Sequence, residues 1–403
     1  MIDKYLSEMS GVVITPDLIE KSVYNMGNVS PIAKVIQKAL NGEEVTICGF
    51  GGSITEGTGM EHNPPEESGI TCSDNTKCYF DRFCDWWDEK FERKLNRVNA
   101  GIGATDTPLA IHRMGKDVFE HNPDFVILEW CCNDGPELLS KQATYEKMVR
   151  SFIEKGIPVI LLSMATRTGV SSQKLHEPIA KFYDVPMISY RDAYMDYEKY
   201  PYFTTDTVHP NKAGCELASL LLCEFIEKVL NDIDNIAEKP LNLPEGFLCE
   251  DAKVYAEPYI VNLKDIYDGK VDGIRIKDLG AFKLDEKMSK FAFRSYYGFS
   301  AYAKDGNVPM VIEIDDIKTL FLLLYRNTVY RNVGFYVEVN GEKIENETFT
   351  SQHGRDNAQT EWDYHWASER ICAYPDREKV ELKIYPTVES ETQCIKIFSL
   401  LIS

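Results

Sequence analysis

Short apolar runs alternate with amphipathic segments over the first 230 residues of the chain. The runs are rich in Val, Ile, Leu and Phe and end at glycine, proline or polar residues, which predicts buried strands. These predicted strands are residues 45–53, 97–99, 124–130, 158–164 and 185–189. Apolar residues recur at helical spacing between them, so helices are predicted near residues 30–42, 79–95, 108–121, 144–155, 171–182 and 211–230. This alternation predicts a three-layer α/β/α domain built on a parallel sheet.

The pattern changes after about residue 235. Residues 239–244, KPLNLP, are typical of a linker, and beyond them apolar and polar residues alternate with the period of a strand. Strands are predicted at residues 310–314, 320–325, 335–339, 380–385 and 394–402, and Asn340-Gly341 indicates a β-hairpin. Short strands separated by turn residues predict a β-sandwich. We therefore divide the chain into an α/β domain at residues 1–234 and a β-sandwich domain at residues 235–403.

Composition and charge narrow the choice of partners. The chain has 403 residues, of which 44% are hydrophobic and 27% charged, as expected for a globular protein with two domains. Its formal net charge of −20 argues against nucleic acid or an anionic membrane as a partner. The same charge is also ordinary for an acidic soluble protein, so it does not indicate a cationic ligand.

The cysteines and the N-terminal residues bear on the compartment. Eleven cysteines are scattered along the chain without an accompanying histidine cluster, so most are expected to be free and no zinc site is expected. The first thirty residues lack the apolar core of a signal peptide, and no run of about eighteen apolar residues occurs. A cytoplasmic, reducing location is expected, and no cofactor is implied.

Ser53 follows the first predicted strand and the glycines Gly51 and Gly52. Glycines at such a turn allow the next side chain to be held exposed at the carboxyl end of the strand, where open α/β sheets bind ligands. The alternative is that Ser53 only caps the following helix.

The sequence DTVHP at residues 206–210 favours the catalytic interpretation of Ser53. Pro210 suits the first position of the helix that follows, so His209 is expected just before that helix, three positions after Asp206. A serine hydroxyl needs a base to take its proton, and the base needs a third group to orient it. Ser53, His209 and Asp206 would supply these three roles.

Four sequence blocks resemble those of the SGNH (GDSL-type) hydrolases. They are GGSIT at residues 51–55 with a following Glu-Gly, NAGIGAT at 99–105, Asn133-Asp134 after a strand, and DTVHP at 206–210. Their order and spacing match the family over residues 27–230. The resemblance implies the flavodoxin-like SGNH fold and a mechanism with Ser53 as nucleophile, His209 as base and Asp206 as the acid that orients it.

The resemblance also implies an oxyanion hole with three donors. In the family these are the amide of the serine, a backbone amide of the second block and the side chain of the third-block asparagine, which correspond to Ser53, Ala104 and Asn133. Two glycines of the family are replaced, one by Ala104 and one by Cys131. Because the second-block donor is a backbone amide, alanine can still serve if its φ and ψ are compatible. Gly52 replaces the aspartate of the GDS sequence, which leaves the role of the serine intact.

The second domain contains the aromatic sequence EWDYHW at residues 361–366. Sugar faces stack on aromatic rings, so Trp362 and Trp366 are candidate substrate-binding residues that would hold a sugar near Ser53. The alternative is that these rings face the core of the sandwich, which is the favoured interpretation for Tyr364.

SGNH enzymes of this layout resemble carbohydrate esterases that remove acetyl groups from plant polysaccharides or oligosaccharides. The expected activity is therefore deacetylation of oligosaccharides such as acetylated xylan or mannan fragments. A lipid or thioester acylhydrolase of the same superfamily would use the same triad, and a catalytically inactive carbohydrate-binding protein is a third alternative. The intact Ser53, His209, Asp206 and Asn133 argue against the last.

Overall fold

The computed structural model describes residues 1–403 except 1–8, 135–138, 292–293, 328–333, 345–363 and 388–393. The chain forms two compact units, the first comprising residues 1–110 and 114–252 and the second residues 111–113 and 253–403. Residues 235–252, which the sequence analysis places in the second domain, are part of the first unit. No helix among the described residues is long and apolar enough to cross a membrane.

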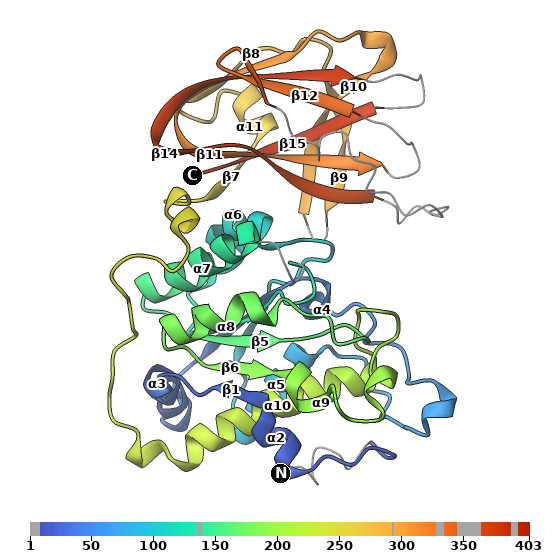
Figure 1. Ribbon diagram of the computed structural model, residues 1–403, viewed down its shortest axis with the longest axis vertical. Helices are drawn as coiled ribbons and strands as arrows, with labels where there is room; N and C mark the ends of the chain where they lie inside the picture. The colour runs from blue at the N-terminus through green and yellow to red at the C-terminus, as the bar shows by residue number, and fades with distance from the viewer. Residues whose placement is uncertain (1–8, 135–138, 292–293, 328–333, 345–363, 388–393) are drawn as a thin grey trace. The chain divides into compact units, whose positions relative to one another are not determined.

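The first unit is built on a six-stranded sheet with the order β1-β6-β5-β4-β2-β3. Its strands β1, β6 and β5 are labelled in Figure 1. Five strands are parallel, and β1 pairs antiparallel with β6 at one edge. The strands are β1 (Val23–Asn25), β2 (Thr46–Gly51), β3 (Asn96–Asn99), β4 (Phe125–Glu129), β5 (Val159–Ser163) and β6 (Met187–Ser189). The five parallel strands are those predicted from the sequence, and their order is the flavodoxin-like one.

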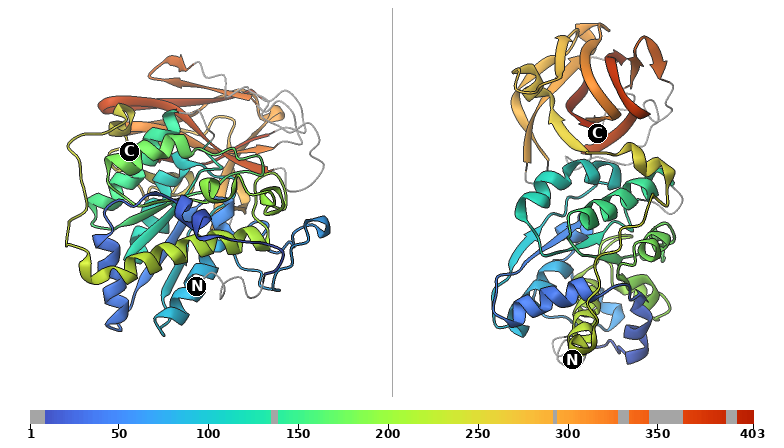
Figure 2. Two further views of the ribbon diagram at one scale, coloured as in Figure 1. Left: turned by 60° about the horizontal axis from the view of Figure 1, so that its bottom comes forward. Right: turned by 90° about the vertical axis from the view of Figure 1, so that its left-hand side faces the viewer.

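Helices flank the sheet between successive strands (Figure 2). The longer ones are α3 (Ser30–Leu40), α5 (Tyr79–Lys90), α6 (Thr107–Asp117), α7 (Leu139–Glu154), α8 (Gln173–Phe182) and α10 (Lys212–Asn231). The shorter ones are α2 (Pro16–Ser22), α4 (Ser53–Glu56) and α9 (Tyr190–Tyr194). The longer helices are predicted from their apolar period, and the sequence also predicts a helical turn at residues 16–24, where α2 lies.

Both faces of this sheet are covered, because neighbouring strand positions bury rings against different helices. Phe125 of β4 lies 6.4 Å from Phe83 and 5.9 Å from Trp87 of α5, measured between ring centroids. Phe50 of β2 lies 6.5 Å from Phe152 of α7. The predicted three-layer α/β/α arrangement is thereby confirmed.

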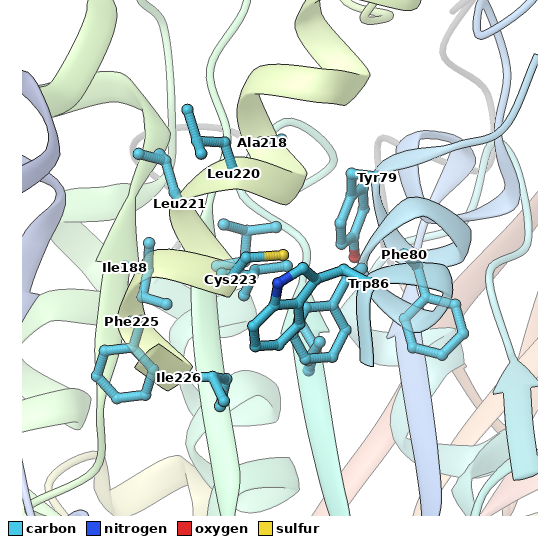
Figure 3. Close-up of a cluster of buried hydrophobic side chains, with 14 of the residues drawn as sticks. Tyr79, Phe80, Trp86, Ile188, Ala218, Leu220, Leu221, Cys223, Phe225 and Ile226 are labelled. Atoms are coloured by element: carbon cyan, nitrogen blue, oxygen red, sulfur yellow. The ribbon is translucent and has the colours of Figure 1, made fainter. Parts of the chain in front are cut away.

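The core on the α5 side is formed by α5 packed on α10. Trp86 of α5 points toward Cys223 of α10 (Figure 3). Both belong to a buried cluster that also contains Tyr79, Phe80, Ile188, Ala218 and Leu220. Apolar residues occur all round α10, as expected for a helix that is buried on most sides. α10 follows the loop that holds His209, so its burial fixes one side of the site.

The segment after α10, residues 239–249, forms hydrogen bonds to other parts of the first unit. Asn28 Nδ2 donates to the carbonyl of Pro240 over 2.8 Å, and Lys239 N donates to Ser30 Oγ over 2.9 Å. Further along, Leu248 N and Cys249 N both donate to the carboxylate of Glu146, each over 2.6 Å. The predicted linker is therefore an extended segment bound along the α/β unit.

The second unit is an antiparallel β-sandwich with the strand order β13-β12-β14-β11-β15-β10-β9. β7 also pairs with β15, and β8 with β11. The strands are β7 (Tyr259–Asn262), β8 (Ile274–Asp278), β9 (Lys283–Phe291), β10 (Arg294–Tyr302), β11 (Met310–Asn327), β12 (Gly334–Val339), β13 (Glu342–Ile344), β14 (Tyr364–Thr387) and β15 (Cys394–Ile402). A short helix, α11 (Leu263–Tyr267), follows β7.

Two long strands link the layers of the sandwich. The first part of β11 pairs with β8, and its last part pairs with β15, with register shifts against β14 between them. Such irregularities bend a strand, so β11 and β14 pass from one layer to the other. The segments predicted as two strands at 310–314 and 320–325 are thus parts of one strand. The hairpin predicted at Asn340-Gly341 joins β12 to β13 and is confirmed.

Candidate active site

Ser53 lies at the carboxyl end of β2, as the first residue of the short helix α4. Its backbone is fixed by close packing around Gly51, two residues earlier, because a Cβ on Gly51 would lie 2.0 Å from Thr55 Oγ1 and 2.7 Å from the Glu129 carbonyl oxygen. No side chain fits there. The Ser53 side chain emerges beyond this packed turn, with 8% of the residue exposed.

His209 and Asp206 lie in the loop before α10. The helix begins at Lys212 with Asn211 as its N-cap, so Pro210 precedes the helix instead of occupying its first position. Asp206 Oδ1 accepts hydrogen bonds from Val208 N over 2.6 Å and from His209 N over 2.7 Å. These bonds fold the loop into a turn of the kind that aspartate favours, and the turn brings the imidazole back over the carboxylate.

The three side chains form a continuous hydrogen-bonded chain. His209 Nδ1 lies 2.7 Å from Asp206 Oδ2, and His209 Nε2 lies 2.8 Å from Ser53 Oγ. With the proton on Nδ1 donated to the carboxylate, Nε2 is free to accept the proton of Ser53 Oγ–H. The structure therefore brings together three residues that are up to 156 positions apart in the chain.

Hydrogen bonds decide the charge state of Asp206. Burial alone would raise the pKa of this carboxyl, but its bonds to the His209 ring and to two backbone amides lower it below the usual value. Asp206 is thus ionised at neutral pH, and its carboxylate can accept the hydrogen bond from His209 Nδ1. The side chain of His209 is 21% exposed, so a substrate can approach the base from solvent.

Arg167 forms hydrogen bonds to the loop that contains His209. Its backbone N donates to the Thr207 carbonyl over 2.9 Å, and its guanidinium donates to Thr204 Oγ1 over 3.0 Å and to the Thr204 carbonyl over 3.1 Å. The loop is also closed on itself, since Thr205 N donates to the His209 carbonyl over 2.8 Å. Sequence reasoning missed Arg167, because no fixed spacing links the loop after β5 to the loop before α10.

Asn133 lies against the backbone of Gly52, the residue before Ser53. A Cβ on Gly52 would lie 2.4 Å from Asn133 Oδ1 and 2.9 Å from Asn133 Nδ2, so the amide is in contact with the turn that carries the serine. Asn133 follows β4, and Asn133 N donates to the Trp130 carbonyl over 3.0 Å. The replacement of the family's aspartate by Gly52 therefore has a local reason, which is that the amide of Asn133 fills the space of a side chain.

Ala104 adopts the left-handed conformation, with φ of 55°. The same turn lies beside the serine, because a Cβ on Gly103 would lie 3.5 Å from Ser53 Cβ. Gly103 N donates to Glu56 Oε2 over 3.0 Å, so this amide is already used and the next one, of Ala104, is the candidate donor. The expectation that alanine can adopt the glycine conformation here agrees with the observed φ.

A buried carboxyl that cannot be recognised in the sequence lies beside Thr55 of the Ser53 helix. Glu129 ends β4, is fully buried, and has Oε2 at 3.4 Å from Thr55 Oγ1, which in turn lies 2.9 Å from the hydroxyl of Tyr79. Burial raises the pKa of Glu129 to about 8, and the bond from Thr55 only partly offsets this. Glu129 is thus mostly protonated at neutral pH. In the sequence, Glu129 is only a glutamate at the end of an apolar run, so its burial and protonation could not be predicted.

The two tryptophans expected to hold a sugar are placed differently. Trp362 lies outside the described residues, whereas Trp366 belongs to β14, where it pairs with Tyr325 of β11. Their role in sugar binding stays a prediction. Among the described residues, no group of three or more His, Cys, Asp or Glu side chains is placed to hold a metal ion.

Comparison with known proteins bears on the first unit. Residues 50–217 match the model of the GDSL-like Lipase/Acylhydrolase family, and this range contains all the candidate site residues of the α/β unit. The chain contains a GDSL-like hydrolase domain. The resemblance stated from the four sequence blocks is confirmed. No curated protein matches the sequence.

Solved structures extend the similarity to both units. A two-domain esterase (CEX) active on acetylated mannans matches with a TM-score of 0.74 at 20% sequence identity, covering 96% of this chain and 98% of that one. The same esterase co-crystallized with mannopentaose matches with a TM-score of 0.73 and the same identity and coverage. At this identity the match establishes a shared two-domain fold, a GDSL-like hydrolase unit followed by a β-sandwich.

Proposed function

We propose that this protein is a serine esterase that removes O-acetyl groups from carbohydrates. The observation that carries the proposal is the hydrogen-bonded chain from Ser53 through His209 to Asp206. A carboxylate with a lowered pKa, an imidazole that it orients and a serine hydroxyl within hydrogen-bond distance of that imidazole form the arrangement required for acyl transfer.

In the first half-reaction, Ser53 Oγ attacks the carbonyl carbon of the acetyl ester and its proton passes to His209 Nε2. The negative charge that develops on the carbonyl oxygen is stabilised by the amides of Ser53 and Ala104 and by the side-chain amide of Asn133. The tetrahedral intermediate then collapses, and the bond to the sugar oxygen breaks. That oxygen takes the proton from His209, which leaves an acetyl group on Ser53.

Water completes the cycle. His209 takes a proton from water as the water oxygen attacks the acetyl-serine, and a second tetrahedral intermediate forms in the same oxyanion site. Its collapse returns the proton to Ser53 Oγ and releases acetic acid, which ionises in solution. Ordered release of sugar before acetate predicts ping-pong kinetics.

The choice of substrate rests on the two-domain match and on charge. The matching esterase is active on acetylated mannans, and it shares both units with this chain. The carboxylate of Glu56 lies beside the turn that contains Gly103 and Ala104. The chain as a whole has a net charge of −20. Negative charge at the site disfavours an anionic substrate such as an acyl-coenzyme A thioester, which is one of the alternatives. An acetylated manno-oligosaccharide is neutral, so it meets no such repulsion.

A substrate panel tests the proposal. Acetylated manno-oligosaccharides, acetylated xylo-oligosaccharides, acetyl-coenzyme A and p-nitrophenyl esters of acetate and of longer acids would each be incubated with the protein and with Ser53→Ala. Mass spectrometry and acetate release would report deacetylation. We expect the highest kcat/KM on an acetylated oligosaccharide and loss of all activity in Ser53→Ala. Preference for long-chain esters or for the thioester would instead favour the acylhydrolase alternative.

A further inference from the structure

The turn that carries Asn133 is bounded by two residues that share one partner. Cys131 lies two positions before Asn133 and Asp134 one position after it, and both face His176 of α8. His176 Nδ1 lies 3.2 Å from Cys131 Sγ, and His176 Nε2 lies 3.5 Å from Asp134 Oδ2. The ring also stacks on Tyr145 of α7, with centroids 3.6 Å apart and planes 3° from parallel. The imidazole is thus held in its plane by one helix while its edges contact both sides of the turn.

The charges in this cluster require each other. Asp134 is fully buried, and its Oδ1 accepts hydrogen bonds from Thr107 N and Thr107 Oγ1 over 3.1 and 3.0 Å. Its Oδ2 has no hydrogen-bond partner of standard geometry among the described residues, and the same holds for His176 Nε2, so the two atoms face each other. A buried carboxylate without a partner is strongly unfavourable. Burial raises the pKa of Asp134, and the neighbouring His176 counteracts this rise, so a protonated His176 supplies the compensating charge when Asp134 is ionised.

The protonation state of His176 agrees with this pairing. Burial alone would lower the pKa of the imidazole, but the neighbouring Cys131 sulfur and the Asp134 carboxylate outweigh it and raise the pKa to about 9. His176 is only 1% exposed, so its two ring N–H groups can reach no partner in solvent. Both are directed at the turn.

The Asn133 side chain depends on its surroundings for its position. Its Oδ1 is buried without a hydrogen-bond partner among the described residues, so the amide is not anchored through that atom. What fixes the residue is its backbone, through Asn133 N to the Trp130 carbonyl over 3.0 Å and Lys141 Nζ to the Asn133 carbonyl over 3.3 Å. The amide also packs against Gly52, and the contacts of the flanking Cys131 and Asp134 with His176 hold the turn from which the amide extends.

We propose that His176 is a positioning residue, which holds the Asn133 amide toward the reacting carbonyl oxygen by binding Cys131 and Asp134 on both sides of it. This inference rests on the proposed esterase function. It also accounts for the cysteine at position 131, where a glycine was expected. A glycine has no side chain for Nδ1 to contact, so Cys131 and His176 act as a pair.

The role predicts a specific kinetic signature. The oxyanion is absent from the bound ester and develops only as the tetrahedral intermediate forms, so a displaced Asn133 should lower kcat and leave KM unchanged. A displacement of about 1 Å in a positioned group can cost about a hundredfold in rate. If His176 acts through Asn133, its removal should cost little once the Asn133 amide is already gone, because residues that act as a unit are not additive.

The experiment is a double-mutant cycle between His176→Phe and Asn133→Ala. Phenylalanine keeps the stacking on Tyr145 and removes both ring nitrogens. With p-nitrophenyl acetate and active sites counted by burst titration, we expect His176→Phe to lower kcat about 10- to 100-fold alone and less than about threefold in the Asn133→Ala background. Equal losses in both backgrounds would overturn the inference. His112, another buried histidine on α6, provides the matched control His112→Phe, for which any loss should be the same in both backgrounds.

A milder pair of variants covers the case in which His176→Phe does not fold. Cys131→Ala removes the atom that contacts Nδ1, and Cys131→Ser replaces it with a hydroxyl that can still form a hydrogen bond. We expect kcat to fall about tenfold in Cys131→Ala and to be mostly restored in Cys131→Ser, with KM constant. If Cys131→Ala had the same kcat as the wild type, the inference about His176 would be overturned. The proposed function would stand, because the wild type would still hydrolyse the ester. Absence of ester hydrolysis by the wild type would instead refute the proposed function.

Discussion

Replacing Gly52 by alanine would place a methyl group inside the space of the Asn133 amide. The new Cβ would lie 2.4 Å from Asn133 Oδ1, 2.8 Å from Cγ and 2.9 Å from Nδ2, whereas ordinary contacts of a carbon atom are about 3.5 Å or longer. The amide must therefore move by about 1 Å. The backbone cannot relieve the clash easily, because a Cβ on the preceding Gly51 already meets Thr55 Oγ1 at 2.0 Å.

The consequence should be confined to the transition state. A shift of about 1 Å can cost roughly a hundredfold, and removal of one oxyanion donor costs about 100- to 1,000-fold in kcat. We expect Gly52→Ala to lower kcat about 100-fold on p-nitrophenyl acetate, with KM changed little, and to lose little more when combined with Asn133→Ala. A hundredfold loss corresponds to about 2.7 kcal/mol of transition-state stabilisation.

Steady-state kinetics with burst titration would measure the effect per active site. Gly115 in α6 is the matched control, because a Cβ there meets nothing within 4 Å. Gly115→Ala should leave kcat unchanged and stabilise the helix by about 1 kcal/mol. If folded Gly52→Ala kept kcat within threefold of the wild type, the Asn133 side chain would not be a hydrogen-bond donor to the oxyanion.

Three further predictions test separate parts of the molecule. Ala104→Gly should raise the melting temperature slightly and preserve kcat, because the left-handed φ of 55° costs alanine about 1 kcal/mol and the donor is a backbone amide; a lower melting temperature would contradict this. Burial raises the pKa of Glu129 to about 8, so the stability of the wild type, full below about pH 4.5, should fall as pH rises through 8. Glu129→Gln should remove that loss, so that at pH 9 its free energy of unfolding in urea exceeds that of the wild type by up to about 5 kcal/mol. Parallel curves of unfolding free energy against pH for the two proteins would refute the assignment. Trp362→Ala and Trp366→Ala should weaken hydrolysis of acetylated oligosaccharides more than of p-nitrophenyl acetate; equal losses with a lower melting temperature would assign these rings to the core.

The parts of the fold that could be predicted from the sequence are those with a local pattern. β2, β4 and β5 are continuous apolar runs, and each was found within two residues of its predicted bounds. The strand β11 was divided in two because Asp315-Asp316 interrupts its alternation, yet the chain continues through this pair with a shift in register. β9 was missed because its sequence, KLDEKMSKF, is mostly polar, and only its pairing with β10 makes it a strand.

The same distinction applies to the site. Ser53, His209 and Asn133 stand in short blocks with recognisable neighbours, so they could be found in the sequence. The contact between Cys131 and His176 could not be predicted from the sequence, because these residues are 45 positions apart and no periodicity links them. Buried polar contacts of this kind depend on how helices pack on the sheet. They are visible only once the fold is known.

Identification of the acylated residue tests the central claim most directly. The protein would be mixed with excess acetylated manno-oligosaccharide, quenched in acid within the first turnovers, digested, and mapped by mass spectrometry. The mechanism predicts an acetyl group on Ser53 in the wild type, and neither label nor turnover in Ser53→Ala. Acetate release that persists in folded Ser53→Ala, or an acetyl group that maps to another residue, would contradict the assignment of Ser53 as the nucleophile.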